Sequence, residues 1–69
     1  MLTATAVSKP VQQRFDIEVT VEGVSEATLD LDIRAVAYAA ARETPSRTFG
    51  SNITRHLDTH TATVKIHRD

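Results

Sequence analysis

The sequence predicts a small α+β domain whose elements follow one another in the order β-β-α-β. The three strands form an antiparallel sheet, and one Ala-rich helix packs on one face of it. Two observations favour this class. One segment alternates apolar and polar side chains, which is typical of a half-buried strand. An alanine-rich segment with apolar residues at helical spacing follows it. The 69 residues of the chain suffice for a single domain over residues 1–69.

Two strands are expected before the helix. Residues 2–7 predict a short strand, and Pro10 with its polar neighbours predicts a turn over residues 8–13. Residues 14–22 show the clearest pattern, because apolar residues alternate there with polar ones. The apolar set is Phe15, Ile17, Val19 and Val21, and the polar set is Asp16, Glu18, Thr20 and Glu22. The first set is predicted to face the core and the second to face water.

The helix is predicted to begin after Gly23 and to end near Glu43. Ser25 is the expected N-cap, and Pro45 disfavours helical geometry at the residue before it. The apolar face of the helix is expected to consist of Leu29, Ile33, Val36 and Ala40. A second interpretation stays open, because residues 27–32 also alternate and therefore fit a further strand, with the helix then beginning only at Asp32.

The C-terminal part is predicted to hold one short helix and one strand. Residues 44–59 are polar and irregular, and Ser51 is the expected cap of one or two helical turns that carry Ile53 and Leu57. Residues 60–67 alternate again, which predicts the third strand of the sheet. Its predicted inward residues are Ala62, Val64 and Ile66, and its outward residues are Thr61, Thr63, Lys65 and His67.

The composition excludes several classes of protein. The formal net charge is −1, which is too balanced for a strongly basic nucleic-acid binder. The chain has no cysteine, so disulfides, cysteine-ligated zinc and cysteine nucleophiles are excluded. No apolar run approaches the roughly 20 residues of a membrane span, and residues 1–4 do not resemble the start of a signal peptide. We therefore expect a cytoplasmic protein without a membrane partner.

No catalytic, metal-binding or cofactor-binding residues are predicted. His56 and His60 have the spacing of one helix face, but the glutamate of a His-Glu-x-x-His motif is missing. No serine has a Gly-x-Ser-x-Gly context, and Gly23 and Gly50 are too few for a phosphate-binding loop. We expect a protein that is not an enzyme and that binds no cofactor.

An acidic surface is the predicted partner-binding site. Residues 16–32 contain no Lys or Arg, and their acids are Asp16, Glu18, Glu22, Glu26, Asp30 and Asp32. If the strand and the helix start adjoin, these side chains form one negative surface that fits a basic groove on another protein. The alternative interpretation is a solubilising face with acids placed for the helix dipole.

Two further surfaces are candidates. Residues 35–41 carry no charge, and Ala35, Tyr38 and Ala39 are predicted at the outer edge of the helix as the seam of a homodimer or of a partner complex. Arg42, Arg47 and Arg55 are candidate nucleic-acid contacts. The predicted sheet presents acids and threonines outward and no stacking aromatic, so a protein partner is favoured over a nucleic acid.

The chain resembles small phage and mobile-element proteins, including the anti-CRISPR inhibitors. The resemblance rests on the acidic strand at residues 16–22, on the helix start Ser25-Glu26-Ala27 and on the Ala-rich helix. It implies stoichiometric inhibition of a host nucleic-acid-guided complex. In that function the acids meet Lys and Arg side chains that normally hold phosphate, and the protein acts in the host cytoplasm.

Overall fold

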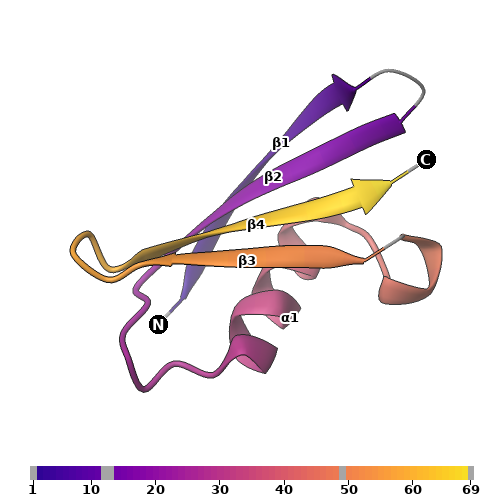
Figure 1. Cartoon of the computed structure of the whole chain (residues 1–69). Coiled ribbons are helices and arrows are strands. Elements are labelled where there is room, and N and C mark those ends of the chain that lie inside the picture. The colour runs from indigo at the N-terminus through magenta and orange to yellow at the C-terminus, as the bar shows by residue number, and fades with distance from the viewer. Residues whose placement is uncertain (1, 12–13, 49, 69) are drawn as a thin grey trace.

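The computed structural model describes residues 2–11, 14–48 and 50–68. Within them lie β1 (Thr3–Val11), β2 (Arg14–Glu22), α1 (Asp30–Ala41), the 3-10 helix η1 (Pro45–Arg47), β3 (Ser51–His56) and β4 (Thr61–Arg68). These strands make one antiparallel sheet in the order β1-β2-β4-β3, so two hairpins join through β2 and β4 (Figure 1). Helix α1 packs across β1, β2 and β4. The predicted α+β class is confirmed.

The two central strands supply most of the core. Their inward side chains face one another across the ladder and are buried: Ile17, Val19 and Val21 on β2, and Ile66, Val64 and Ala62 on β4. The alternation predicted for both segments is therefore confirmed, except at Phe15, whose side chain lies outside the described part of the chain. Strand β1 adds Ala4 and Ala6, which are half-buried against the same core.

The buried face of α1 agrees with the predicted one at Ile33 and at the half-buried Val36, and it differs at Leu29 and Ala40. Ile33 and Ala37 are fully buried and Tyr38 is 7% exposed, whereas Leu29 and Ala40 are exposed. Leu29 precedes the first helical turn, so its spacing from Ile33 does not place it on the buried face. The small side chain of Ala37 permits close approach of the helix to the sheet, and Ile33, Ala37 and Tyr38 together define the buried face of α1.

Helix α1 begins at Asp30, later than predicted, with Leu29 as its N-cap. Ser25 does not cap it. The Thr28 N–H donates to the Ser25 carbonyl at 3.1 Å, and the Ser25 N–H donates to Thr28 Oγ1 at 3.0 Å, so these residues close a turn instead. Residues 27–32 pair with none of the described strands, and the strand interpretation of this segment is wrong.

Helix α1 ends at Ala41, before the predicted end near Glu43, because Arg42 adopts the left-handed conformation with φ 56° and ψ 40°. The Glu43 N–H donates to the Tyr38 carbonyl at 3.1 Å, and the Arg42 N–H donates to the Ala39 carbonyl at 3.2 Å. This pair of bonds is a Schellman motif, whose left-handed position is most often glycine. An arginine at that position costs stability, because its Cβ crowds the backbone.

Strand β3 replaces the short helix predicted from Ser51 onward, and it raises the number of strands in the described sheet from three to four. Its inward residues Ser51, Ile53 and Arg55 alternate with the exposed residues Asn52, Thr54 and His56. Only Ile53 among these inward residues is apolar, so the alternation of apolar and polar residues that marks a strand is not visible in the sequence. Leu57 lies in the β3–β4 turn, and its helical spacing from Ile53 therefore has no structural meaning.

Strand β1 continues through residues 8–11, which the sequence predicts as part of a turn, and it pairs there with β2. Pro10 takes part in this pairing. A proline lacks the N–H that a central strand needs for a second neighbour, and β1 tolerates it because β1 lies at the edge of the sheet. The rest of the predicted turn, residues 12–13, lies outside the described residues.

We expect β3 to open before the rest of the sheet. It is an edge strand with half-buried inward side chains, and polar bonds tie it to the helix, including one from Arg34 Nε to Ser51 Oγ at 3.2 Å. Amides in the β3–β4 ladder should exchange with solvent at least about tenfold faster than amides in the β2–β4 ladder. Native-state hydrogen exchange measures both. Equal protection would show that β3 unfolds only together with the whole domain.

Candidate functional site

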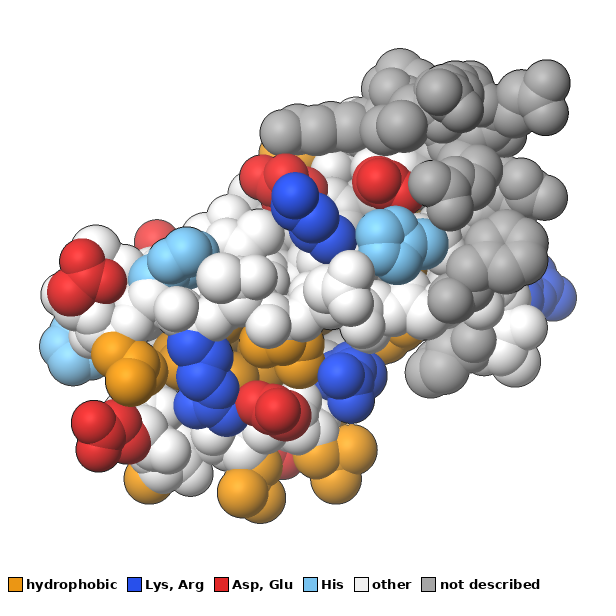
Figure 2. All heavy atoms as spheres, in the orientation of Figure 1, with side chains coloured by type: hydrophobic (Ala, Val, Ile, Leu, Met, Phe, Trp, Pro, Cys, Tyr) orange, Lys and Arg blue, Asp and Glu red, His pale blue; other side chains and the backbone are white. Residues whose placement is uncertain are grey.

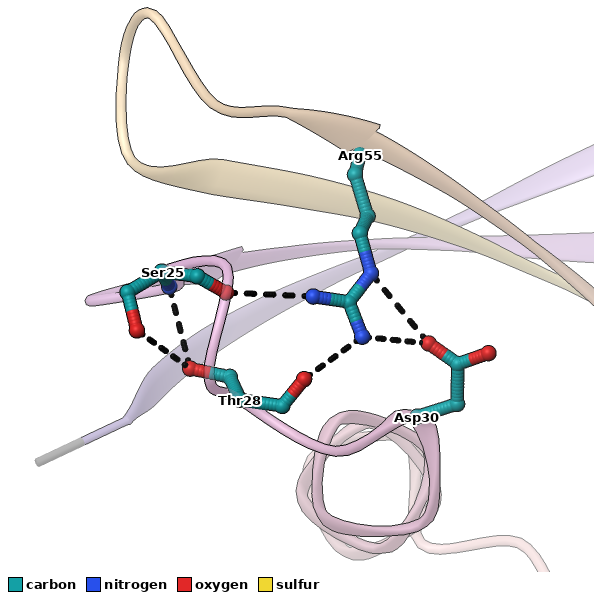
Figure 3. A network of polar contacts seen from close by, with 4 residues as sticks. All are labelled: Ser25, Thr28, Asp30 and Arg55. Atoms are coloured by element: carbon teal, nitrogen blue, oxygen red, sulfur yellow. Dashed lines mark hydrogen bonds and ion pairs between the residues drawn. The ribbon is translucent and has the colours of Figure 1, made fainter.

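Arg55 joins strand β3 to the segment that leads into α1 (Figure 3). Its Nε and Nη2 donate to Asp30 Oδ1 at 3.2 and 2.5 Å. Its Nη1 donates to the Ser25 carbonyl at 3.1 Å, and Nη2 also donates to the Thr28 carbonyl at 2.6 Å. All three guanidinium nitrogens are engaged in a planar arrangement that a lysine cannot reproduce. These bonds fix the backbone ahead of the helix, so the donors of this predicted nucleic-acid contact are committed within the chain.

The segment held by Arg55 presents two large apolar side chains to solvent. Leu29 and Leu31 are 63% and 72% exposed. Glu26 and Asp32, which precede and follow them in the sequence, are exposed as well. We define Glu26, Ala27, Leu29, Leu31 and Asp32 as the helix-start face. Figure 2 shows hydrophobic side chains that project from the lower rim of the molecule, where the helix lies in this orientation.

A shallow hollow adjoins the helix-start face. It has a volume of about 450 Å³, and its lining residues are Ser25, Glu26, Ala27, Leu57 and His60. The turn between β3 and β4 therefore forms one wall, and the segment before α1 forms the other. Leu57 and Ala27 make part of the lining apolar, so the depression beside the projecting leucines accepts an apolar side chain.

The structure divides the six acids of the predicted surface between two sides of the molecule. Asp16, Glu18 and Glu22 lie on the outward positions of β2, whereas Glu26, Asp30 and Asp32 belong to the loop and the helix. Asp16 Oδ1 lies 3.1 Å from His67 Nδ1, and Glu18 stands opposite Lys65 in the register. The first two carboxylates thus face basic side chains of the sheet itself. At the helix start, by contrast, the exposed acids Glu26 and Asp32 lie next to the exposed Leu29 and Leu31 in the sequence.

The face of the sheet that α1 leaves open is polar. A row of threonines crosses it as register neighbours on all four strands: Thr5, Thr20, Thr63 and Thr54. On the same face, four residues further along β2 and β4, His67 Nδ1 lies 3.1 Å from Asp16 Oδ1 and His67 Nε2 lies 3.2 Å from the Asn52 amide nitrogen, which links β2, β4 and β3. None of the described side chains on this face is Phe, Tyr or Trp, so they offer bases no aromatic platform.

Two of the predicted seam residues are exposed and the third is buried. Ala35 and Ala39 lie on the outer side of α1, in line with Leu31 at intervals of four residues. Tyr38 is buried, and its hydroxyl makes a hydrogen bond of 3.2 Å with Thr48 Oγ1. The exposed ridge of the helix therefore consists of Leu31, Ala35 and Ala39, and it continues the helix-start face along α1.

Two of the three predicted nucleic-acid contacts lie together. Arg42 and Arg47 line an open hollow with a volume of about 1030 Å³. Arg55 instead lies at the other end of α1, where it is bonded to Ser25, Thr28 and Asp30. Arg68 is the third arginine of this hollow. Sequence reasoning did not single out Arg68, because only the strand order brings the end of β4 beside the residues that follow α1.

The histidines form no metal site in the part of the chain that the structure describes. His56 Nε2 lies 3.3 Å from Thr63 Oγ1, and His60 occupies the β3–β4 turn with φ 56°. No group of three or more His, Cys, Asp or Glu side chains among the described residues is arranged around a common point for a metal. Over the same ranges, no helix has the length and the apolar character that crossing a membrane requires.

The chain is thus a small α+β domain with an open sheet face and a projecting helix start. Comparison with protein-family models, with curated proteins and with solved structures found no match. Its function is inferred from its own surfaces.

Replacement of Arg55 by alanine should loosen the segment before α1 and leave the domain folded. The lost bonds are partly exposed and water replaces them in part, so we expect a cost of about 1 kcal/mol. That cost lowers Tm by roughly 5 °C in a domain of this size. Arg47→Ala is the matched control, because Arg47 is exposed and has no side-chain bond among the described residues. Thermal melts measure both variants. A Tm of Arg55→Ala equal to that of Arg47→Ala would show that the bonds of Arg55 contribute nothing to stability.

Proposed function

We propose that the chain is a non-enzymatic protein-binding domain that docks through its helix-start face. The observation that carries the proposal is the exposure of Leu29 and Leu31, at 63% and 72%, on a backbone that Arg55 holds in place. Large apolar side chains held out in water favour contact with a partner, because their burial releases the water around them. The partner is a protein that offers an apolar cleft with basic residues around it.

The two leucines supply the apolar centre of such a contact. Full burial of one leucine side chain is worth about 1.5–3 kcal/mol, which matches the size of a hot spot within a larger interface. Ala35 and Ala39 extend the contact along α1, since small side chains permit close approach of a second surface. The hollow beside Leu57 accepts one side chain of the partner.

The charge of the helix-start face selects a basic partner. Glu26 and Asp32 are exposed, and Asp30 balances the charge of Arg55 through their ion pair. Arg34, three residues after Leu31, adds one positive charge. Glu26 and Asp32 keep the surroundings of the leucines net negative, which favours encounter with Lys and Arg side chains. Inhibition of a nucleic-acid-guided complex is one form of this proposal, in which the basic partner surface otherwise holds phosphate.

Differential capture tests the proposal. Tagged wild-type protein is incubated with lysate of the native host cells, with and without nuclease, and the Leu29→Ser/Leu31→Ser variant is treated in parallel. A stoichiometric protein should survive nuclease on the wild type and be lost from the variant. Val7→Ser is the matched control, because Val7 is 53% exposed on the open face of the sheet. Reversal of Glu26 and Asp32 to lysine should weaken capture by about tenfold at low salt.

Three outcomes separate the forms of the proposal. A partner that is lost from Val7→Ser and kept by the leucine variant moves the docking surface to the open sheet and contradicts the proposal. A partner that disappears with nuclease indicates that nucleic acid, and not protein, was bound. A captured protein whose own nucleic-acid binding falls as wild-type domain is added supports the inhibitor form.

A further inference from the structure

We infer that the hollow at the C-terminal end of α1 binds the phosphate group of a nucleotide, either free or within a strand. This site is independent of the helix-start face, because the two lie at opposite ends of α1. The turn after α1, the 3-10 helix η1 and the last described residue of β4 line the hollow, which is open to solvent. Its volume of about 1030 Å³ lies just above the range of roughly 300–1,000 Å³ for small-molecule sites, so a whole nucleotide fits it.

The lining of the hollow is net positive. Arg42, Arg47 and Arg68 share it with one acid, Glu43. Glu43 is only 11% exposed and pairs with Arg68 at 2.9 Å, so one of the cations is neutralised within the chain. Arg42 and Arg47 are exposed and make no side-chain hydrogen bond or ion pair within residues 2–11, 14–48 and 50–68. Two guanidinium groups are therefore available to an anion.

Hydroxyl groups complete the wall of the hollow. Thr44 Oγ1 and Ser46 Oγ lie 3.3 Å apart, and Thr48 also lines the hollow. A guanidinium group binds two phosphate oxygens through parallel N–H···O bonds, so Arg42 and Arg47 match a phosphate ester. The Thr48 hydroxyl is already bonded to Tyr38 and lines the hollow without being counted as a donor. The described lining contains no Phe, Tyr or Trp, and the inference therefore rests on the phosphate and not on a base.

The backbone of Arg42 points to a role beyond stability. Its left-handed conformation, with φ 56° and ψ 40°, is one that glycine adopts without strain. A strained residue beside a hollow is typical of functional sites. A cation that only complemented the helix dipole would act equally well within the last turn of α1, where no basic residue lies. The arginine is thus placed at the rim of the hollow at a cost to the fold.

Fluorescence anisotropy with a labelled dT strand of about twelve nucleotides tests the inference. The wild type should bind at about 20 mM salt, and log K should fall against log salt with a slope near −1.4, or about −0.7 for each of two phosphates. Arg47→Gln should weaken binding about fivefold with Tm unchanged. Arg42→Gly should weaken binding as much and raise Tm by roughly 4 °C, because glycine relieves the left-handed backbone. A purely structural role of Arg42 does not produce this combination.

Lys65→Gln is the matched control, because it removes one positive charge from an exposed residue on the open face of the sheet. It should change affinity less than about twofold. Equal losses in all three variants would reduce the effect to net charge and overturn the inference, as would absence of binding by the wild type at low salt. Displacement of the strand by AMP assigns the site to a free nucleotide, and displacement only by unlabelled dT strand assigns it to nucleic acid.

Discussion

Replacement of Ile33 by alanine should remove a large part of the stability of this domain. Ile33 is fully buried in the core that α1 forms with the sheet. Truncation of a buried isoleucine costs about 2–5 kcal/mol. A chain of 69 residues has a free energy of unfolding of about 3–10 kcal/mol, because small domains bury a smaller share of their surface. We expect a large fall in the urea midpoint and partial unfolding of the variant at physiological temperature.

Leu31→Ala is the matched control for this prediction. Leu31 is on the same helix and loses a similar amount of aliphatic side chain, but it is exposed to water in the folded state. Its truncation should change the free energy of unfolding by less than about 0.5 kcal/mol. Urea titration followed by circular dichroism measures both variants. A loss at Leu31 as large as the loss at Ile33 would contradict the rotation of α1 and, with it, the helix-start face.

Replacement of Tyr38 by alanine should have an effect of similar size. The ring is buried between α1 and the sheet, and its loss costs about 3–5 kcal/mol. Tyr38→Phe keeps the ring and loses only the bond with Thr48, which is worth about 1 kcal/mol. The difference between the two variants isolates the packing of the ring from its hydrogen bond.

The Tyr38 variants also separate a core residue from a seam residue. A tyrosine in the seam of a homodimer yields a folded monomer when it is truncated, because only the interface is lost. Truncation of a core tyrosine instead lowers the free energy of unfolding by about 3–5 kcal/mol, whatever the oligomeric state. Circular dichroism and light scattering on Tyr38→Ala distinguish the two. A folded monomeric variant of a dimeric wild type would restore the seam that the sequence predicts at this position.

The central strands were predictable because their environment repeats along the chain. One face of β2 and β4 meets the helix layer and the other faces water, so every second residue is apolar. This pattern is local, so it can be recognised in the sequence without knowing which strands lie beside each other. The α+β class and the inward residues of both strands follow from it.

Strand β3 was not predictable in the same way. Arg55 occupies an inward position, and an arginine there reads as a solvent residue in any local pattern. Its bonds to residues 25–30 make the position acceptable, and those partners lie far away in the sequence. A long-range polar contact therefore replaced the apolar signal that identifies a strand.

The start of α1 depends on a contact that the sequence does not mark. Val24 is buried, and Gly23 N and Val24 N both lie within hydrogen-bond distance of the His60 carbonyl, at 3.0 and 2.9 Å. The chain is thereby held on the sheet after β2 and leaves the core only through residues 25–29. Ser25 belongs to this connecting segment, several residues before the helix begins at Asp30, so it cannot cap the helix.

The candidate surfaces show the same limit. The acids of residues 16–32 were visible in the sequence, but the change of layer between β2 and α1 separates them. Leu29 and Leu31 were visible too, and helical spacing assigned Leu29 to the core because the helix start was placed too early. Their exposure follows only once Asp30 is known as the first helical residue.

Photo-crosslinking from position 31 tests the helix-start face most directly. A photoreactive phenylalanine analogue replaces Leu31 in one variant and Val7 in another, and both are irradiated in lysate of the native host cells. Because the helix-start face is the proposed docking surface, the position-31 variant should crosslink to one protein, with one copy of the domain for each copy of that protein. Excess wild-type domain should suppress the product. The position-7 variant should give no such product. A crosslinked partner from position 7 alone would contradict the assignment of the helix-start face as the binding surface.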